Sequence, residues 1–120
     1  MNIEELRDNC LSKKGVKECL PFDDTTLVFK VMDKMFALTS LDTAFRFTIK
    51  TDPDNGAHLR EIHPAVQQAY HMNKKHWIMV DVDGSVDDAR LQQWIDASYE
   101  LVVSGLTRKK RELLLQNKTL

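Results

Sequence analysis

Hydrophobic and polar positions first follow a helical spacing and then alternate. From residue 3 to residue 11 apolar side chains recur every three or four positions, directly after Asn2, a good N-terminal cap. Lys13, Lys14 and Gly15 are typical of a helix end. From residue 16 to residue 22 the period is two, and Pro21 predicts an edge strand because proline cannot donate to a neighbouring strand.

Three more strands and a second helix are expected in the middle of the chain. Residues 26–32 and 35–41 are rich in β-forming side chains, and Asp33-Lys34 between them predicts a two-residue hairpin turn. Residues 45–49 alternate between apolar and polar, which predicts a strand with one dry and one wet face. Asp52-Pro53 begins the second helix and Pro64 ends it.

A second hairpin and a long helix follow. Residues 66–72 and 76–82 are expected to be strands around a turn at Asn73-Lys74. Ser85 and Asp88 form a capping-box start for the clearest helix of the chain, which Gly105 closes. The predicted order is α-ββββ-α-ββ-α, an α+β fold with an antiparallel sheet covered by helices. We assign residues 1–105 to one domain and residues 106–120 to a basic tail with a short helix around residues 113–115.

Composition and charge restrict the kind of partner. The 120 residues, 42% hydrophobic and 29% charged, are ordinary for one globular domain. The formal net charge of -1 excludes a protein that wraps nucleic acid over its whole surface, so any such contact is local. After residue 105, five cations face one anion, or +4, which leaves -5 for the rest of the chain.

The cysteines and the N-terminal segment point to the cytoplasm. Cys10 and Cys19 are too few for a disulfide framework and indicate free thiols in a reducing compartment. The first five residues do not resemble a signal peptide, and apolar runs such as residues 78–80 are too short to span a bilayer.

A search for catalytic and metal-binding motifs finds none. His58/His63 and His71/His76 are each five residues apart, whereas two helical ligands need a spacing of four. The segment around Gly84 fails as a calcium loop, because Arg90 stands where the last carboxylate is required. The sequence also has no nucleophile elbow and no glycine-rich phosphate loop. We therefore expect no enzyme activity, no cofactor and no metal.

The most distinctive segment is residues 70–77, which contain two lysines, two histidines and two aromatic residues. Lys74 and Lys75 at a hairpin tip are suited to neutralise phosphates, and a β-ribbon is narrow enough to enter a DNA groove. Alternatively, the aromatic side chains anchor the hairpin to the core and the lysines protect an exposed edge. The basic residues 108–111 have two interpretations as well: they bind phosphates beside the hairpin, or they are a solvated chain end.

Several segments together resemble the MmcQ/YjbR family. They are residues 21–26 (PFDDTT), 29–31 (FKV), 34–38 (KMFAL), 70–77 (YHMNKKHW), 83–84 (DG) and 98–102 (SYELV). The resemblance implies a CyaY-like (frataxin-like) "double wing" fold and a DNA-binding role, with no catalytic residues to transfer. The chain departs from the family pattern at Asp33, where glycine is usual, at Gln68-Ala69, where Pro-Gly is common, and at Ile78-Met79, where polar residues often follow the tryptophan.

The leading hypothesis is thus a non-enzymatic DNA-binding module. Lys74 and Lys75 would contact phosphates together with Arg108, Lys109, Lys110 and Arg111, and His71, Asn73 and His76 would add secondary contacts. Two alternatives remain: a domain of frataxin-like fold that binds a small anionic ligand or a metal, and a protein–protein adaptor. The sequence leaves the oligomeric state open, with a monomer favoured.

Overall fold

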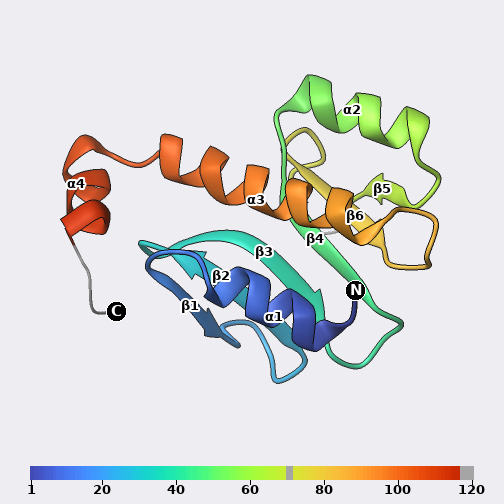
Figure 1. Cartoon of the computed structure of the whole chain (residues 1–120), viewed down its shortest axis with the longest axis horizontal. Helices are drawn as coiled ribbons and strands as arrows, with labels where there is room; N and C mark the ends of the chain where they lie inside the picture. Colours follow the sequence, from blue (N-terminus) through green and yellow to red (C-terminus); the bar gives the residue numbers. More distant parts are fainter. Residues whose placement is uncertain (70–71, 117–120) are drawn as a thin grey trace.

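A computed structural model describes residues 1–69 and 72–116 of the chain (Figure 1). Six strands form one antiparallel sheet in the order β1-β2-β3-β4-β6-β5. The α+β prediction and the predicted order of elements are confirmed, with one more helix at the end. The strands are β1 Val16–Cys19, β2 Thr26–Val31, β3 Lys34–Ser40, β4 Arg46–Lys50, β5 Val66–Gln68 and β6 Trp77–Asp81, and the helices are α1 Ile3–Leu11, α2 Pro53–Ile62, α3 Asp88–Ser104 and α4 Arg108–Gln116.

The first three helices begin at side-chain caps. The Asn2 Oδ1 atom accepts from the Glu5 N–H at 2.8 Å, and Asp52 caps α2 in the same way. The expected start of α3 at Ser85 is wrong. Its cap is Asp87, whose carboxylate accepts from the Arg90 N–H, whereas Ser85 is engaged in a turn with Asp83.

Three strand boundaries also differ from the prediction. The first strand ends at Cys19, before Pro21, rather than at residue 22. The β2–β3 turn is centred on Met32 and Asp33, one residue earlier than expected, and both have positive φ (49° and 65°), as this type of tight hairpin turn requires. β5 is Val66–Gln68 and ends before Ala69, whereas the expected strand ran to residue 72; residues 70 and 71 of that expectation lie outside the described residues.

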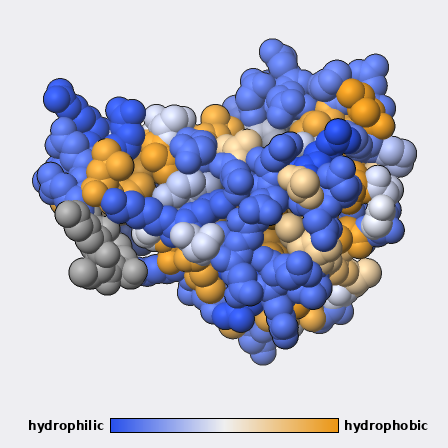
Figure 2. All heavy atoms as spheres, in the orientation of Figure 1, coloured by the Kyte–Doolittle hydropathy of each residue, from blue (hydrophilic) through white to orange (hydrophobic). Residues whose placement is uncertain are grey.

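The helices cover one face of the sheet. Figure 1 shows α1 and α3 in front of the strands. Side chains from this face, such as Phe29, Phe47 and Ile78, form a continuous core with Leu6 of α1 and Ile95 of α3. Hydrophilic side chains cover most of the outer surface of this layer (Figure 2). The other face of the sheet has apolar positions of its own, which do not belong to this core.

A β-bulge joins α3 to the sheet. Phe29 pairs with Ala37 but Lys30 pairs with Met35, so Phe36 is the extra residue of β3. The fully buried Ser98 hydroxyl donates to the Phe36 carbonyl at 2.6 Å and accepts from the Lys50 N–H at 2.9 Å. One side chain of α3 therefore supplies partners for backbone groups of two neighbouring strands where their ladder ends.

Helix α4 packs against the turn between α1 and β1. Leu114 is buried and belongs to the main core. Gly15, with a φ of +74°, lies so close to this side chain that a Cβ atom built on it would clash with the Leu114 Cδ1 atom. The Lys14 ammonium donates to the Leu115 carbonyl at 2.6 Å. The basic segment thus forms a docked helix, longer than the short helix expected from the sequence.

We predict that Ser98→Ala lowers the free energy of unfolding by at least about 1–3 kcal/mol, because it leaves two buried backbone groups without partners. Urea unfolding followed by circular dichroism measures this change. Ser104→Ala is the matched control, because its hydroxyl donates to Leu101 at the exposed end of the same helix. Equal unfolding midpoints for the two variants would contradict the proposed role of Ser98.

We also predict that Leu114→Ala loosens α4 and makes residues 108–111 more sensitive to trypsin, because a protease needs locally unfolded chain. Limited proteolysis with mass spectrometry identifies the cleavage sites. Leu115→Ala serves as the control, since that side chain is 69% exposed. If Leu114→Ala is cleaved at the same rate as the control, burial of Leu114 does not hold the helix.

Candidate nucleic-acid interface

The loop before β6 presents its lysines on a braced turn. The Asn73 Oδ1 atom accepts from the Lys75 N–H at 2.9 Å, and the Asn73 carbonyl accepts from the N–H groups of His76 and Trp77. The His76 carbonyl in turn accepts from the Thr51 N–H at 2.8 Å. The side chains of Lys74, Lys75 and His76 are exposed. The backbone of this loop is therefore fixed while its cations face solvent.

Strand pairing brings this loop and α4 to the same end of the sheet. Val16 pairs with Val31, and Lys50 pairs with Trp77. Consequently one end of the sheet contains the first residues of β1, β3 and β6 and the last residues of β2, β4 and β5. Helix α4 lies at the β1–β2 side of this end, and the loop lies at the β4–β6 side. Two basic segments more than thirty residues apart in the chain share one end of the sheet.

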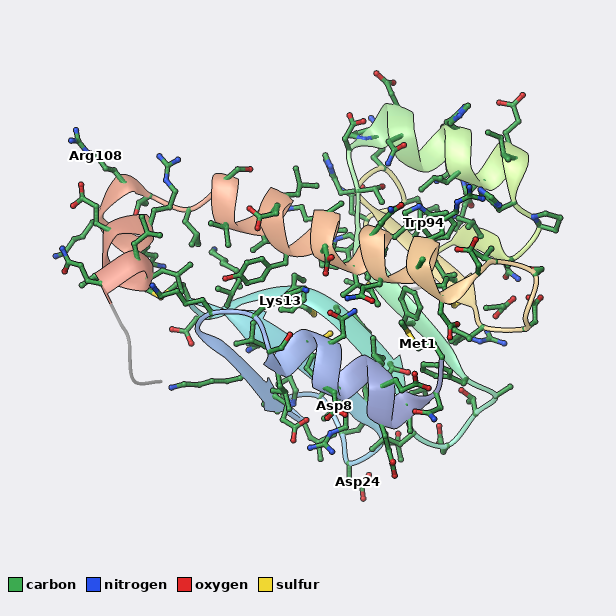
Figure 3. All side chains as sticks on the ribbon, viewed as in Figure 1. Met1, Asp8, Lys13, Asp24, Trp94 and Arg108 are labelled. Atoms are coloured by element: carbon green, nitrogen blue, oxygen red, sulfur yellow. The ribbon has the colours of Figure 1, made fainter. Side chains whose placement is uncertain are left out.

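The cations of α4 face outward. Arg108, Lys109 and Arg111 are exposed and Lys110 is half-buried. Figure 3 shows Arg108 directed away from the body of the molecule. Its guanidinium lies 3.2 Å from Glu112 in the same helix, a pair that is exposed on both sides. Such a pair contributes little stability, so the guanidinium can exchange Glu112 for a phosphate.

A groove lies on the face of the sheet that the helices leave open. It has a volume of about 510 Å³ and runs across β2, β3, β4 and β6. Its lining is mostly apolar: Phe22, Thr26, Met35, Leu38, Thr48, Met72, Asn73 and Trp77. The loop before β2 and the loop before β6 form its two sides, so that the groove adjoins the lysine-bearing turn at Asn73.

Charges around the groove are unevenly distributed. By strand register Lys30 pairs with Met35, which lines the groove, whereas Lys50, the partner of Trp77, lines a separate hollow with Trp94 and Leu101 of α3. The acidic residues at the Phe22 end are Asp23 and Asp24. Hydrogen bonds from the Thr25 N–H and from the Thr26 N–H and hydroxyl lower the pKa of the Asp23 carboxyl, which is therefore ionised at neutral pH.

Sequence reasoning found the lysines but not the groove. His71 lies outside the described residues, and Asn73 uses its side-chain oxygen within the loop. Trp77, which one interpretation of the sequence assigns to the core as an anchor, lines the groove on the opposite face of the sheet. No motif in the sequence marks Phe22, Met35 or Leu38 as site residues. The alternation of apolar and polar residues along β4 and β6 predicts on which face of the sheet Thr48 and Trp77 lie. It does not predict that Phe22, in the loop before β2, lines the same groove as these two residues.

Other chemistry has little support within the described residues. Among them, no three His, Cys, Asp or Glu side chains lie close enough together to hold a metal ion. The His63 ring packs edge-on against Trp94, with 5.2 Å between the ring centroids. Burial raises the pKa of the Cys10 thiol to about 12, so it is not a ready nucleophile. In the part of the chain that the structure describes, no helix has the length and apolar character needed to cross a membrane.

Two kinds of comparison relate the chain to known proteins by sequence. The family model YjbR matches residues 11–101. The YjbR protein of Escherichia coli strain K12 is 35% identical over 117 residues, which cover 97% of this chain and 99% of that protein. The YbdF protein of E. coli O157:H7 is 37% identical over 98 residues, 81% of this chain and 80% of the relative.

Solved structures agree with the sequence comparisons. The crystal structure of the Deinococcus radiodurans protein DR2400 superposes with a TM-score of 0.89 at 39% identity, covering 99% of this chain and 91% of that one. A crystal structure of a Pseudomonas syringae protein gives a TM-score of 0.73 at 27% identity, covering 84% and 98%. On this agreement of sequence and structure, the chain belongs to the YjbR (MmcQ/YjbR) family.

Proposed function

We propose that this protein binds DNA without catalysing a reaction on it, through the basic end of its sheet. The contacting groups are Lys74 and Lys75 in the loop before β6, together with the exposed cations of α4, residues 108–111. His76 and the amide of Asn73 lie beside the lysines and add polar contacts.

One observation carries the proposal: two basic segments that are separate in sequence lie at the same end of the sheet, α4 at the β1–β2 side and the loop at the β4–β6 side. The chain as a whole has a formal charge of -1, so this concentration of cations is local and does not follow from composition. Each lysine or arginine that neutralises a phosphate releases condensed counterions, which favours binding at low salt.

The structure of the loop supports phosphate contact rather than a role in packing. Lys74 and Lys75 are exposed, and the hydrogen bonds that fix their turn come from Asn73 and Thr51 rather than from the ammonium groups. Because the loop backbone is already fixed, the loop loses little conformational entropy when DNA binds. The two free cysteines fit the cytoplasm as the compartment in which this binding takes place.

We predict that Lys74→Ala combined with Lys75→Ala weakens binding to all DNA sequences by a similar factor. It should also reduce the slope of log affinity against log salt by roughly one unit per lost contact. Fluorescence polarisation with labelled DNA at several salt concentrations measures both effects. The double variant Arg60→Ala with Arg90→Ala removes the same charge on the helix side of the molecule. If the lysine variant binds no more weakly than this control, the lysines do not contact DNA.

For α4, we predict that Lys109→Ala combined with Arg111→Ala also lowers the salt slope, because both exposed side chains reach phosphates of the same DNA segment. Alanine preserves the helix, so the fold should be unchanged. The same polarisation titrations report the slope, and circular dichroism checks the helix. Unchanged affinity with an intact helix would restrict the interface to the loop before β6.

A further inference from the structure

We infer that the groove on the open face of the sheet binds an unpaired base, so that the protein prefers single-stranded DNA to duplex DNA. This inference rests on the DNA binding proposed above and specifies which form of DNA the site takes. It assigns a function to residues outside the basic segments, above all Phe22 and Trp77.

The dimensions and lining of the groove fit a planar, mostly apolar group. Its volume of about 510 Å³ lies within the range of about 300–1,000 Å³ usual for small-ligand sites. Phe22 lines it from the loop before β2 and Trp77 from β6, and Met35 and Met72 contribute further apolar lining. Aromatic side chains stack on any base, whatever its identity, but only when the base is unpaired and its faces are free.

Polar groups in the groove are suited to the edge of a base. Thr26, Thr48 and Asn73 are the polar residues of the lining. The Asn73 side-chain oxygen is occupied by the Lys75 N–H, which leaves its amide nitrogen free to donate. The Thr26 hydroxyl already donates to Asp23, so a base between Phe22 and Trp77 would meet the Asn73 amide nitrogen and the Thr48 hydroxyl as its donors.

The position of the cations determines how a strand would run. Asn73 and Trp77 line the groove from the β6 side, and Lys74 and Lys75 directly follow Asn73. Phosphates on either side of a bound base would therefore pass along the β6 side of the groove. At the opposite side, Asp24 points into solvent at the edge of the molecule (Figure 3). Asp23 is already bonded to Thr25 and Thr26.

The same charges disfavour a second copy of this chain as the occupant. A two-fold interface would set one apolar groove against another, and the acids it could offer to Lys74 and Lys75 are Asp23 and Asp24, of which Asp23 is already bonded to Thr25 and Thr26. A single strand of nucleic acid has both a flat base that fits the apolar groove and negative phosphates that fit the neighbouring lysines.

Phe22→Ala is the first variant to test, because Phe22 is 68% exposed and its loss should not unfold the protein. We expect it to weaken binding of a single-stranded oligonucleotide about five-fold or more, with binding of a duplex of the same sequence unchanged. Ile62→Ala is the control, as it truncates another exposed apolar side chain, 53% accessible, on α2. Equal single-strand affinities for the two variants would overturn the inference.

Trp77 supplies a direct signal. In a Trp94→Phe background it is the only tryptophan, and we expect its emission to be quenched when single-stranded DNA binds but not when duplex binds. If the oligonucleotide saturates the protein without quenching, or if duplex binds as tightly, the inference fails while DNA binding stands. If neither form binds up to about 100 μM at low salt, the proposed function fails too. Emission that changes with protein concentration alone shows a second copy in the groove and also overturns the inference.

Discussion

The buried hydroxyl of Ser98 is the interaction on which the arrangement of the two faces depends. It bonds to Phe36 in β3 and to Lys50 in β4, at the point where the bulge interrupts the sheet. Because of the bulge, both Phe36 and Ala37 are buried on the helix side, and the Phe36 ring meets Tyr99 of α3 edge-on at 5.4 Å. A regular strand would alternate at this point, so the bulge is what allows Met35 and Leu38 to line the groove on the other face.

The resulting molecule has two apolar surfaces and only one layer of helices. Val28 and Met79 are buried although they do not belong to the main core. On the same face Arg46 lies 3.3 Å from Asp81, which also accepts from Gln67, so the end of the sheet away from the lysines is closed by a polar network. The groove extends from Phe22 and Thr26 to Asn73 and Trp77, so at that second end its side chains and the neighbouring lysines can act on one ligand.

Most of the fold follows from local patterns, and most of the groove does not. Helical spacing and the caps at Asn2 and Asp52 predict α1 and α2 well, because caps act over three or four residues. The position of the β2–β3 turn was predicted one residue too late, because methionine rarely adopts a positive φ. Met32 has this conformation because the tight hairpin turn requires it. The lysines of the proposed site are apparent in the sequence, whereas the proximity of Phe22 to Trp77 arises from strand order and from loops that fold over the sheet.

Helix α4 has a consequence for the order in which the molecule is assembled. Lys14 and Leu115, which bond to each other, are 101 positions apart, so this contact can form only after the entire sheet has been synthesised. Until then the turn at Gly15 lacks the Leu114 side chain that packs against it. On the ribosome, the nascent sheet must therefore persist with one corner open, and its closing is among the last steps of folding.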